Sequence, residues 1–181
     1  MSNTALLVMD MQTAMLGMIP NGAAVTSRVA SAIASARNKG IPVIYVVVGF
    51  RPGAPEISEN NMGFMAAKQM VGHVKPEDFM QIHPDLAPQE NEVVTVKRRV
   101  SAFAGSDLEV VLRAFRIDHI VLTGIATSGV VLSTLREAAD KDFRITVLSD
   151  GCADRDEDVH EFLLTKIFPK QGEVITVAEW K

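Results

Sequence analysis

The sequence predicts an α/β fold in which helices cover both faces of a parallel sheet. Along the 181 residues, short apolar runs alternate with segments of helical periodicity. The runs are rich in β-branched residues and are apolar on both faces, as central parallel strands are. The segments between them are long enough for right-handed crossover helices. We therefore expect about six strands in one three-layer domain over residues 1–181.

The first half of the chain supplies two of these strands. The run Ala5–Met9 (ALLVM) predicts one strand, and Pro42–Val48 (PVIYVVV) predicts the next. Between them, apolar residues recur at helical spacing before Gly40, which stands where a helix would stop. Those apolar residues are Val25, Val29, Ile33 and Ala36.

A long connection follows over residues 49–90. It holds five of the eight prolines and two of the four histidines, and it shows no strong periodicity. We expect one short helix in it, near Met62–Met70. Connections of this length in a compact domain usually cover or line a site.

Regular alternation returns after this connection. The ranges that predict strands are Glu92–Val96, His119–Thr123, Arg144–Leu148 and Val174–Val177. Three helices are expected between them. Ser106 with Glu109 forms a capping box for the first, and Thr127–Asp140 is the second. Asp154 with Glu157 is expected to cap the third.

Composition excludes several classes of protein. Lys and Arg total 18 against 22 Asp and Glu, a net charge of −4, and no basic stripe is present. Nucleic acid and anionic membrane are therefore not expected partners. No apolar run is long enough to span a bilayer, and no signal-peptide pattern is visible, so we expect a cytoplasmic protein. A lone cysteine, Cys152, excludes an intramolecular disulfide framework and a multi-cysteine metal site.

Ligand sites in parallel sheets lie at the carboxyl ends of the strands, and this rule selects Asp10 and Lys97. A carboxylate at this edge is partly desolvated, so its pKa can rise and it can act as a base. Asp10 is equally well explained as the cap of the next segment. Lys97 would face the same crevice and pair with Asp10, or else belong to a solvated basic run with Arg98 and Arg99.

The segment Gly124–Gly129 (GIATSG) is a strand-to-helix turn rich in small residues. Backbone amides at such a turn favour negative charge, so it can serve as an oxyanion hole. It can also be a tight turn capped by Thr127 or Ser128. Its spacing matches neither a dinucleotide fingerprint nor a phosphate-binding loop.

The remaining candidate side chains give weaker signals. Cys152 invites a nucleophile interpretation, but no neighbouring histidine would activate it, so a structural role is favoured. The four histidines form no metal-binding pattern, and surface or packing roles are favoured for His119 and His160. A site role for His73 or His83, in the long connection, has no support from the sequence.

Four separated motifs carry a family resemblance over nearly the whole chain. They are Leu7–Gln12 (LVMDMQ), Val96–Phe103 (VKRRVSAF), Leu122–Gly129 (LTGIATSG) and Leu148–Ala153 (LSDGCA). With these motifs in this order, the chain resembles the isochorismatase-like hydrolases, also called the cysteine hydrolase superfamily. The resemblance implies a three-layer Rossmann-like fold with a six-stranded parallel sheet in the order 3-2-1-4-5-6.

The family's members usually use an Asp, Lys and Cys triad, and the resemblance assigns the first two to Asp10 and Lys97. It implies a cis peptide before Ala126, and oxyanion donors at the amides of Ala126 and Val130. The family's cysteine position is Val130 in this chain, which closes the usual acyl-enzyme route. The metal motif of the nicotinamidase branch is absent after the second strand, so we expect no metal and no cofactor.

We therefore expect a hydrolase that acts on a small anionic metabolite through Asp10 and Lys97 without the usual cysteine. The alternative is a catalytically inactive homologue that binds a small molecule. Substrate contacts are expected from Gln12, Phe50, Arg51 and Phe103, with the two aromatic rings as apolar walls and Arg51 on a carboxylate. The resemblance also implies a homodimer or homotetramer.

Overall fold

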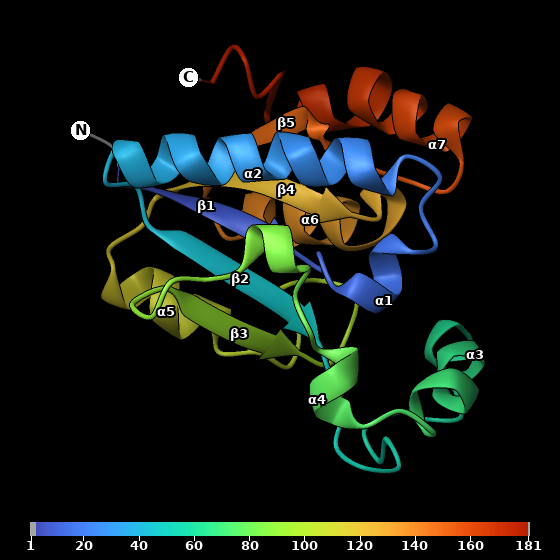
Figure 1. Ribbon diagram of the computed structural model, residues 1–181. Helices are drawn as coiled ribbons and strands as arrows, with labels where there is room; N and C mark the ends of the chain where they lie inside the picture. Colours follow the sequence, from blue (N-terminus) through green and yellow to red (C-terminus); the bar gives the residue numbers. More distant parts are fainter. Residues whose placement is uncertain (1–2, 181) are drawn as a thin grey trace.

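A computed structural model describes residues 3–180 and has a six-stranded sheet in the order β3-β2-β1-β4-β5-β6 (Figure 1). All neighbouring strands run parallel. The strands are β1 (Thr4–Met9), β2 (Val43–Val48), β3 (Val93–Lys97), β4 (His119–Ile125), β5 (Arg144–Ala153) and β6 (Glu173–Ile175). The predicted fold class and strand order are confirmed.

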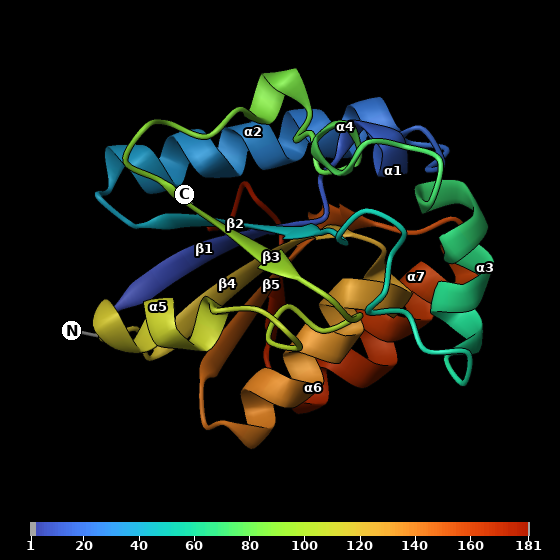
Figure 2. The ribbon, with the colours of Figure 1, turned by 90° about the horizontal axis from the view of Figure 1, so that it is seen from below.

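Helices cover both faces of this sheet, with α2 on one side and α5, α6 and α7 on the other (Figure 2). The helices are α1 (Thr13–Leu16), α2 (Gly22–Asn38), α3 (Met62–Val71), α4 (Pro76–Phe79), α5 (Leu108–Ala114), α6 (Leu132–Asp140) and α7 (Glu157–Phe162). Short helical turns are η1 (Pro84–Leu86), η2 (Thr127–Val131), η3 (Leu163–Ile167) and η4 (Phe168–Lys170).

The central strand β1 is apolar on both faces because it divides two cores. Leu6 and Val8 pack into the core under α2, while Leu7 and Met9 pack into the core that α5 and α6 close. Every residue of β1 from Ala5 to Met9 is at most 1% exposed. The continuous apolar run is thus the sequence signature of a strand buried between two helical layers.

The long connection between β2 and β3 contains the helix predicted near Met62, and also α4 and η1. Helix α3 projects from the body of the molecule in both views (Figures 1 and 2). Phe64 on α3 meets Phe50, just after β2, edge to face with ring centroids 5.7 Å apart. This aromatic contact links the projecting helix to the carboxyl end of β2.

The predicted capping box on α5 is wrong. Ser106 Oγ does accept from the Leu108 amide at 3.2 Å, but Glu109 reaches Lys141 at 2.7 Å instead of its own helix start. A lysine within reach offers this carboxylate a charge-assisted bond, which is stronger than a bond to a neutral amide.

The fifth strand also differs from its predicted range. β5 runs on to Ala153 past a break in register with β4, so Cys152 and Asp150 lie within the strand and not in the loop after it. Asp154 directly follows the extended strand, and the cap of α7 is Asp156 in place of the predicted Asp154, with Oδ1 accepting from the Val159 amide.

Candidate active site

Asp10 and Lys97 meet at the carboxyl ends of β1 and β3. Lys97 Nζ lies 2.9 Å from Asp10 Oδ2, and the two side chains are 2% and 4% exposed. The same ammonium group donates to the carbonyl oxygens of Arg99 and Val100, each at 3.0 Å. The predicted pairing is confirmed, and Lys97 does not belong to a solvated basic run.

The second oxygen of Asp10 has no partner. Among residues 3–180, Oδ1 is the one buried side-chain nitrogen or oxygen atom without a hydrogen bond. Burial raises the pKa of Asp10, and the neighbouring Lys97 opposes that rise. Asp10 also has a φ of +55°, a conformation that is uncommon for residues other than glycine. An unbonded carboxylate oxygen on a strained backbone is a feature of functional sites.

The glycine-rich turn lies beside this pair because β4 is the neighbour of β1. Met9, which precedes Asp10, is in register with Gly124. A Cβ on Gly124 would lie 2.0 Å from the Met9 carbonyl oxygen, and φ there is +135°, so only glycine fits. The next peptide, Ile125–Ala126, is cis, as the sequence resemblance implied.

Two side chains from the segment after β5 hold this turn. Asp154 Oδ2 accepts from the Ser128 amide at 2.7 Å. Hydrogen bonds from backbone amides, including this one, lower the pKa of Asp154. His160 Nδ1 lies 2.7 Å from the hydroxyl of Thr127, a fully buried residue. The role of His160 beside the turn was not predicted from the sequence.

Val130, at the predicted nucleophile position, and Cys152, the lone cysteine, are both buried. Val130 is 2% exposed and packs in the core. Cys152 lies in register with Gly124 on β5, is 4% exposed, and its thiol faces the Leu122 carbonyl oxygen at 3.9 Å. Burial raises the pKa of this thiol to about 12, so it is protonated near neutral pH.

Gln12 is occupied by main-chain bonds. Its amide nitrogen donates to the carbonyl oxygens of Val48 (3.1 Å) and Phe79 (2.6 Å), and its oxygen accepts from the Val48 amide (2.8 Å). The side chain has no exposed surface. The predicted substrate contact is therefore replaced by a bracing role between β1, β2 and α4.

Arg51 is also occupied. Its Nη1 lies 2.6 Å from Glu56 Oε1, and 68% of its side chain is exposed. The Arg51 amide points at the same carboxylate, at 3.3 Å from each oxygen. A guanidinium group already paired with a carboxylate is a weak receptor for a second one, which argues against its predicted contact.

The two predicted aromatic walls lie in different places. Phe50 follows β2 at the carboxyl edge and is 6% exposed. Phe103 stacks on Phe143 with ring centroids 6.0 Å apart, and Phe143 directly precedes β5 at the amino edge. Phe103 thus packs in the core beside Phe143, while the carbonyl oxygen of the next residue, Ala104, accepts from the Arg98 amide at 3.1 Å. Its predicted role as an apolar wall of the site stays a prediction.

A cavity of about 270 Å³ opens beside the cis peptide. Its lining comes from α1 and the loop after it, from the turn after β4, and from the segment after β5. The lining residues are Met15, Met18, Ile19, Ile125, Ala126, Ser128, Asp154 and Arg155. Sequence reasoning missed Arg155, which lies in a run of acidic residues that resembles a solvated loop.

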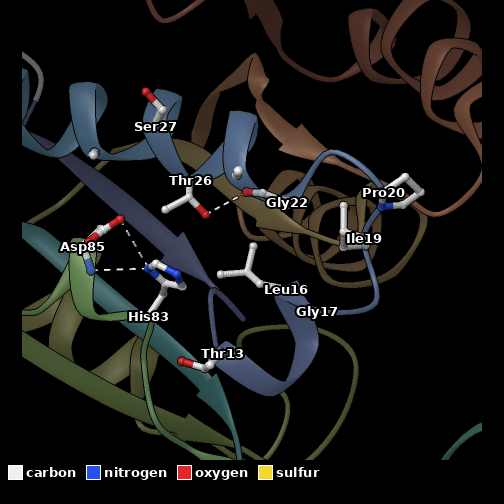
Figure 3. A pocket seen from close by; sticks show the side chains of 12 residues that line it. Thr13, Leu16, Gly17, Ile19, Pro20, Gly22, Thr26, Ser27, His83 and Asp85 are labelled. Carbon is white, nitrogen blue, oxygen red and sulfur yellow. Dashed lines mark hydrogen bonds and ion pairs between the residues drawn. The ribbon is translucent and has the colours of Figure 1, made fainter.

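A larger cavity of about 660 Å³ lies between α1, the start of α2 and η1 (Figure 3). His83 and Asp85 stand at one side of it, and His83 Nδ1 accepts from the Asp85 amide at 3.3 Å. Leu16 and Thr26 stand at the other, with the Thr26 hydroxyl bonded to the Gly22 carbonyl oxygen at 2.8 Å. Neither Asp10 nor Lys97 lines this cavity.

Within the described chain, no group of three His, Cys, Asp or Glu side chains is placed to hold a metal ion. In the same residues, no helix has both the length and the apolar character needed to cross a membrane.

The model of the isochorismatase domain matches residues 4–179. The chain belongs to the isochorismatase family. Within this family it is 34% identical to N-carbamoylsarcosine amidase of Arthrobacter sp over 141 residues, which are 77% of this chain and 53% of that protein. It is 31% identical to maleamate amidohydrolase of Pseudomonas putida over 157 residues, 87% of this chain and 73% of that one.

A solved isochorismatase-family structure from Burkholderia thailandensis superposes with a TM-score of 0.86 at 32% identity. That alignment covers 98% of this chain and 93% of the other. The chain spans about half the length of the N-carbamoylsarcosine amidase that it matches.

Proposed function

We propose that this isochorismatase-family protein hydrolyses a small anionic metabolite, with Asp10 as the proton-transfer group and Lys97 as its charge partner. The observation that carries the proposal is Asp10 Oδ1, a buried carboxylate oxygen that no group of the described chain satisfies. Its partner oxygen is fixed by Lys97 at 2.9 Å, so Oδ1 is held in one direction. Burial raises the pKa of Asp10 towards the range in which a carboxyl group both takes and returns a proton.

The reaction that fits these groups uses water in place of a thiol. Water adds to the electrophilic carbon of the substrate, and Asp10 Oδ1 takes the proton that water gives up. The negative charge that forms on the substrate oxygen meets the amides of Ala126 and Val130 at the turn. The bond to the leaving group then breaks, and Asp10 returns the proton to the leaving atom.

Two features support a route without cysteine. Valine at position 130 has no lone pair to attack with, and Cys152 is a buried thiol whose pKa is raised to about 12. The two named relatives act, by their names, on N-carbamoylsarcosine and maleamate. Each of these molecules is a small carboxylic acid with an amide or carbamoyl group, which is consistent with a small anionic substrate.

The test is hydrolysis of a panel that contains isochorismate, maleamate, N-carbamoylsarcosine and other small amides. We expect wild-type turnover of one member, and a loss of about 10²- to 10⁴-fold in the Asp10→Asn variant, the usual size of a general acid–base contribution. The Cys152→Ala variant serves as the matched control and should keep wild-type turnover. Loss of turnover in Cys152→Ala would contradict the cysteine-free route.

A non-catalytic binding protein is the second candidate, and valine at position 130 is the observation that favours it. In that case the wild type would turn over no member of the panel, whereas Val130→Cys would gain amidase activity beside the retained Asp10 and Lys97.

A further inference from the structure

A loop holds Lys97 in place, in addition to the contact with Asp10. The Lys97 ammonium group lies 2.9 Å from Asp10 Oδ2. It also donates to the carbonyl oxygens of Arg99 and Val100, each at 3.0 Å. An ammonium group has three N–H donors, and these three acceptors can occupy all of them, so its orientation is fixed. The position of the loop after β3 therefore decides where the charge beside Asp10 lies.

Two side chains of α6 bind that loop. The Ala102 amide donates to Thr134 Oγ1 at 2.9 Å, and both residues are fully buried. In the same loop, Ser101 Oγ donates to Glu137 Oε2 at 2.6 Å. Thr134 and Glu137 are neighbours on one face of the helix, so the two hydrogen bonds attach adjacent residues of the loop to the same surface of α6.

Helix α6 also carries the turn that follows β4. The segment η2 ends at Val131 and α6 begins at Leu132, so no loop separates the turn from the helix. Thr134 lies about one helical turn beyond Val130, whose amide is an expected oxyanion donor. One helix therefore connects the loop that holds Lys97 with the turn beside Asp10.

Solvent cannot take the place of the Thr134 hydroxyl, because the Ala102 amide has no exposed surface. The other buried residues of α6, Leu135 and Ala138, are apolar. A polar side chain among them is favourable only if it is hydrogen-bonded, and a buried amide without an acceptor is costly. If the Thr134 oxygen were removed, the loop would shift to satisfy the Ala102 amide, and its carbonyl oxygens would move relative to Lys97.

We propose that Thr134 is a positioning residue of the Asp10–Lys97 pair, and that it acts through the Ala102 amide and the loop that holds the Lys97 ammonium group. The inference deepens the proposed function and rests on it only for the effect on turnover. Glu137 supports the same loop through Ser101, from a position where 35% of its side chain is exposed. Thr134 is fully buried, so its contact is the stronger constraint of the two.

The test follows the titration of Asp10 itself, by NMR of the aspartate carboxyl carbons, with Asp10→Asn to assign the signal. Burial raises the pKa of Asp10, and Lys97 opposes that rise. Thr134→Val keeps nearly the same shape but removes the acceptor, so Lys97 is held less firmly and should oppose the rise less. We expect the titration midpoint of Asp10 to move up by about one pH unit, within the effect of about one to three pH units that an adjacent cation usually has.

Three further variants sharpen the test, and thermal melting confirms that each one folds. Thr134→Ser keeps the hydroxyl oxygen, so its Asp10 should titrate as in the wild type. Ser101→Ala removes the second contact with α6, and it should move the midpoint in the same direction by a smaller amount. Thr26→Val is the matched control, because Thr26 is a buried threonine of α2 whose hydroxyl bonds the Gly22 carbonyl oxygen at 2.8 Å. It should leave the midpoint unchanged.

The titration needs no substrate, so its outcome is separate from that of the proposed function. A shifted midpoint in Thr134→Val supports the inference even where no member of the substrate panel is hydrolysed. Where the wild type hydrolyses a member, the acidic limb of its kcat/KM profile should move up in Thr134→Val by the same amount.

A wild-type midpoint in Thr134→Val would overturn the inference, as would a wild-type midpoint in Ser101→Ala if Thr134→Val did not fold. An equal shift in Thr134→Ser would overturn it too, because the effect would then not depend on the hydroxyl oxygen. An equal shift in Thr26→Val would do the same, because it would mark a general loss of packing.

Discussion

A titratable side chain is buried at the amino edge of the sheet and another at the carboxyl edge, and the two differ in their hydrogen bonding. At the amino edge, His119 is 7% exposed and both ring nitrogens are bonded. Arg144 and Thr4 lie 2.9 and 3.0 Å from Nδ1, and Thr146 lies 2.9 Å from Nε2. Because Arg144 can only donate, Nδ1 accepts, and the ring carries its proton on Nε2.

At the carboxyl edge, Asp10 is 3% exposed, yet one of its two oxygens is unbonded and its backbone is strained. Burial alone therefore does not mark a functional residue in this fold. The property that distinguishes Asp10 is an unmet hydrogen-bonding capacity at a buried oxygen. His119 has no such capacity, which fits a structural role at the edge away from the site.

The largest effect is expected from the glycines at the two edges. Gly124→Ala would place a Cβ 2.0 Å from the Met9 carbonyl oxygen, so β1 and β4 must separate. We expect a loss of about 4 kcal/mol or more in the free energy of unfolding, measured by urea denaturation. Gly40→Ala, at the amino edge with φ +64° and open space around it, should cost about 1 kcal/mol. Similar costs at both sites would refute this account.

The next effect concerns the Asp10–Lys97 pair. Lys97→Met leaves a buried carboxylate without its countercharge, and we expect a loss of about 3 to 5 kcal/mol in the free energy of unfolding. The double variant Asp10→Asn/Lys97→Met removes both charges and should recover much of that loss. Arg28→Met, which breaks an exposed pair with Asp150, should change stability by less than about 1 kcal/mol. A double variant no more stable than Lys97→Met would show that the pair is not coupled.

The smallest effect is a pH dependence at His119. Burial, and then the charge of Arg144, lower the pKa of His119 below its ordinary value of 6.5. The unfolded chain thus binds a proton that the folded chain resists, and stability falls as the pH drops through about 6.5. The slope for one proton is at most about 1.4 kcal/mol per pH unit. The free energy of unfolding of the wild type and of His119→Gln is measured by denaturation between about pH 5 and 8, a range that brackets an ordinary histidine titration. As the pH falls, it should decline more steeply in the wild type.

The fold and the Asp10–Lys97 pair could be predicted because their signals are local. The apolar runs of β1 and β2 define the sheet, and the rule that sites lie at carboxyl edges selects Asp10 and Lys97 without any side-chain information. The ends of the strands were harder to predict from the sequence. Ser149 and Asp150 resemble a turn, yet β5 continues, because Asp150 Oδ1 accepts from the Val177 amide at 2.7 Å.

Most of the contacts that were not predicted join residues far apart in the sequence, and Arg51 with Glu56, five positions apart, is the exception. Arg155 lines the cavity beside the turn after β4, and His160 contacts Thr127 in that turn. The engagement of Gln12 and Arg51 depends on partners that the sequence does not reveal, Val48 and Phe79 for the first and Glu56 for the second. Side-chain type and strand position predicted where these residues are, but not what they bind.

The hydrogen bonds of Gln12 hold both ends of the segment between Val48 and Phe79. The Gln12 side-chain amide bonds Val48, where the β2–β3 connection begins, and Phe79, in the later part of that connection. Both residues are therefore anchored to the segment that follows β1. The two ends of the stretch between these anchors, which includes the projecting helix α3, are thus held by one side chain. Loss of the Gln12 side chain would therefore free both ends of this stretch at once, although they are far apart in the sequence.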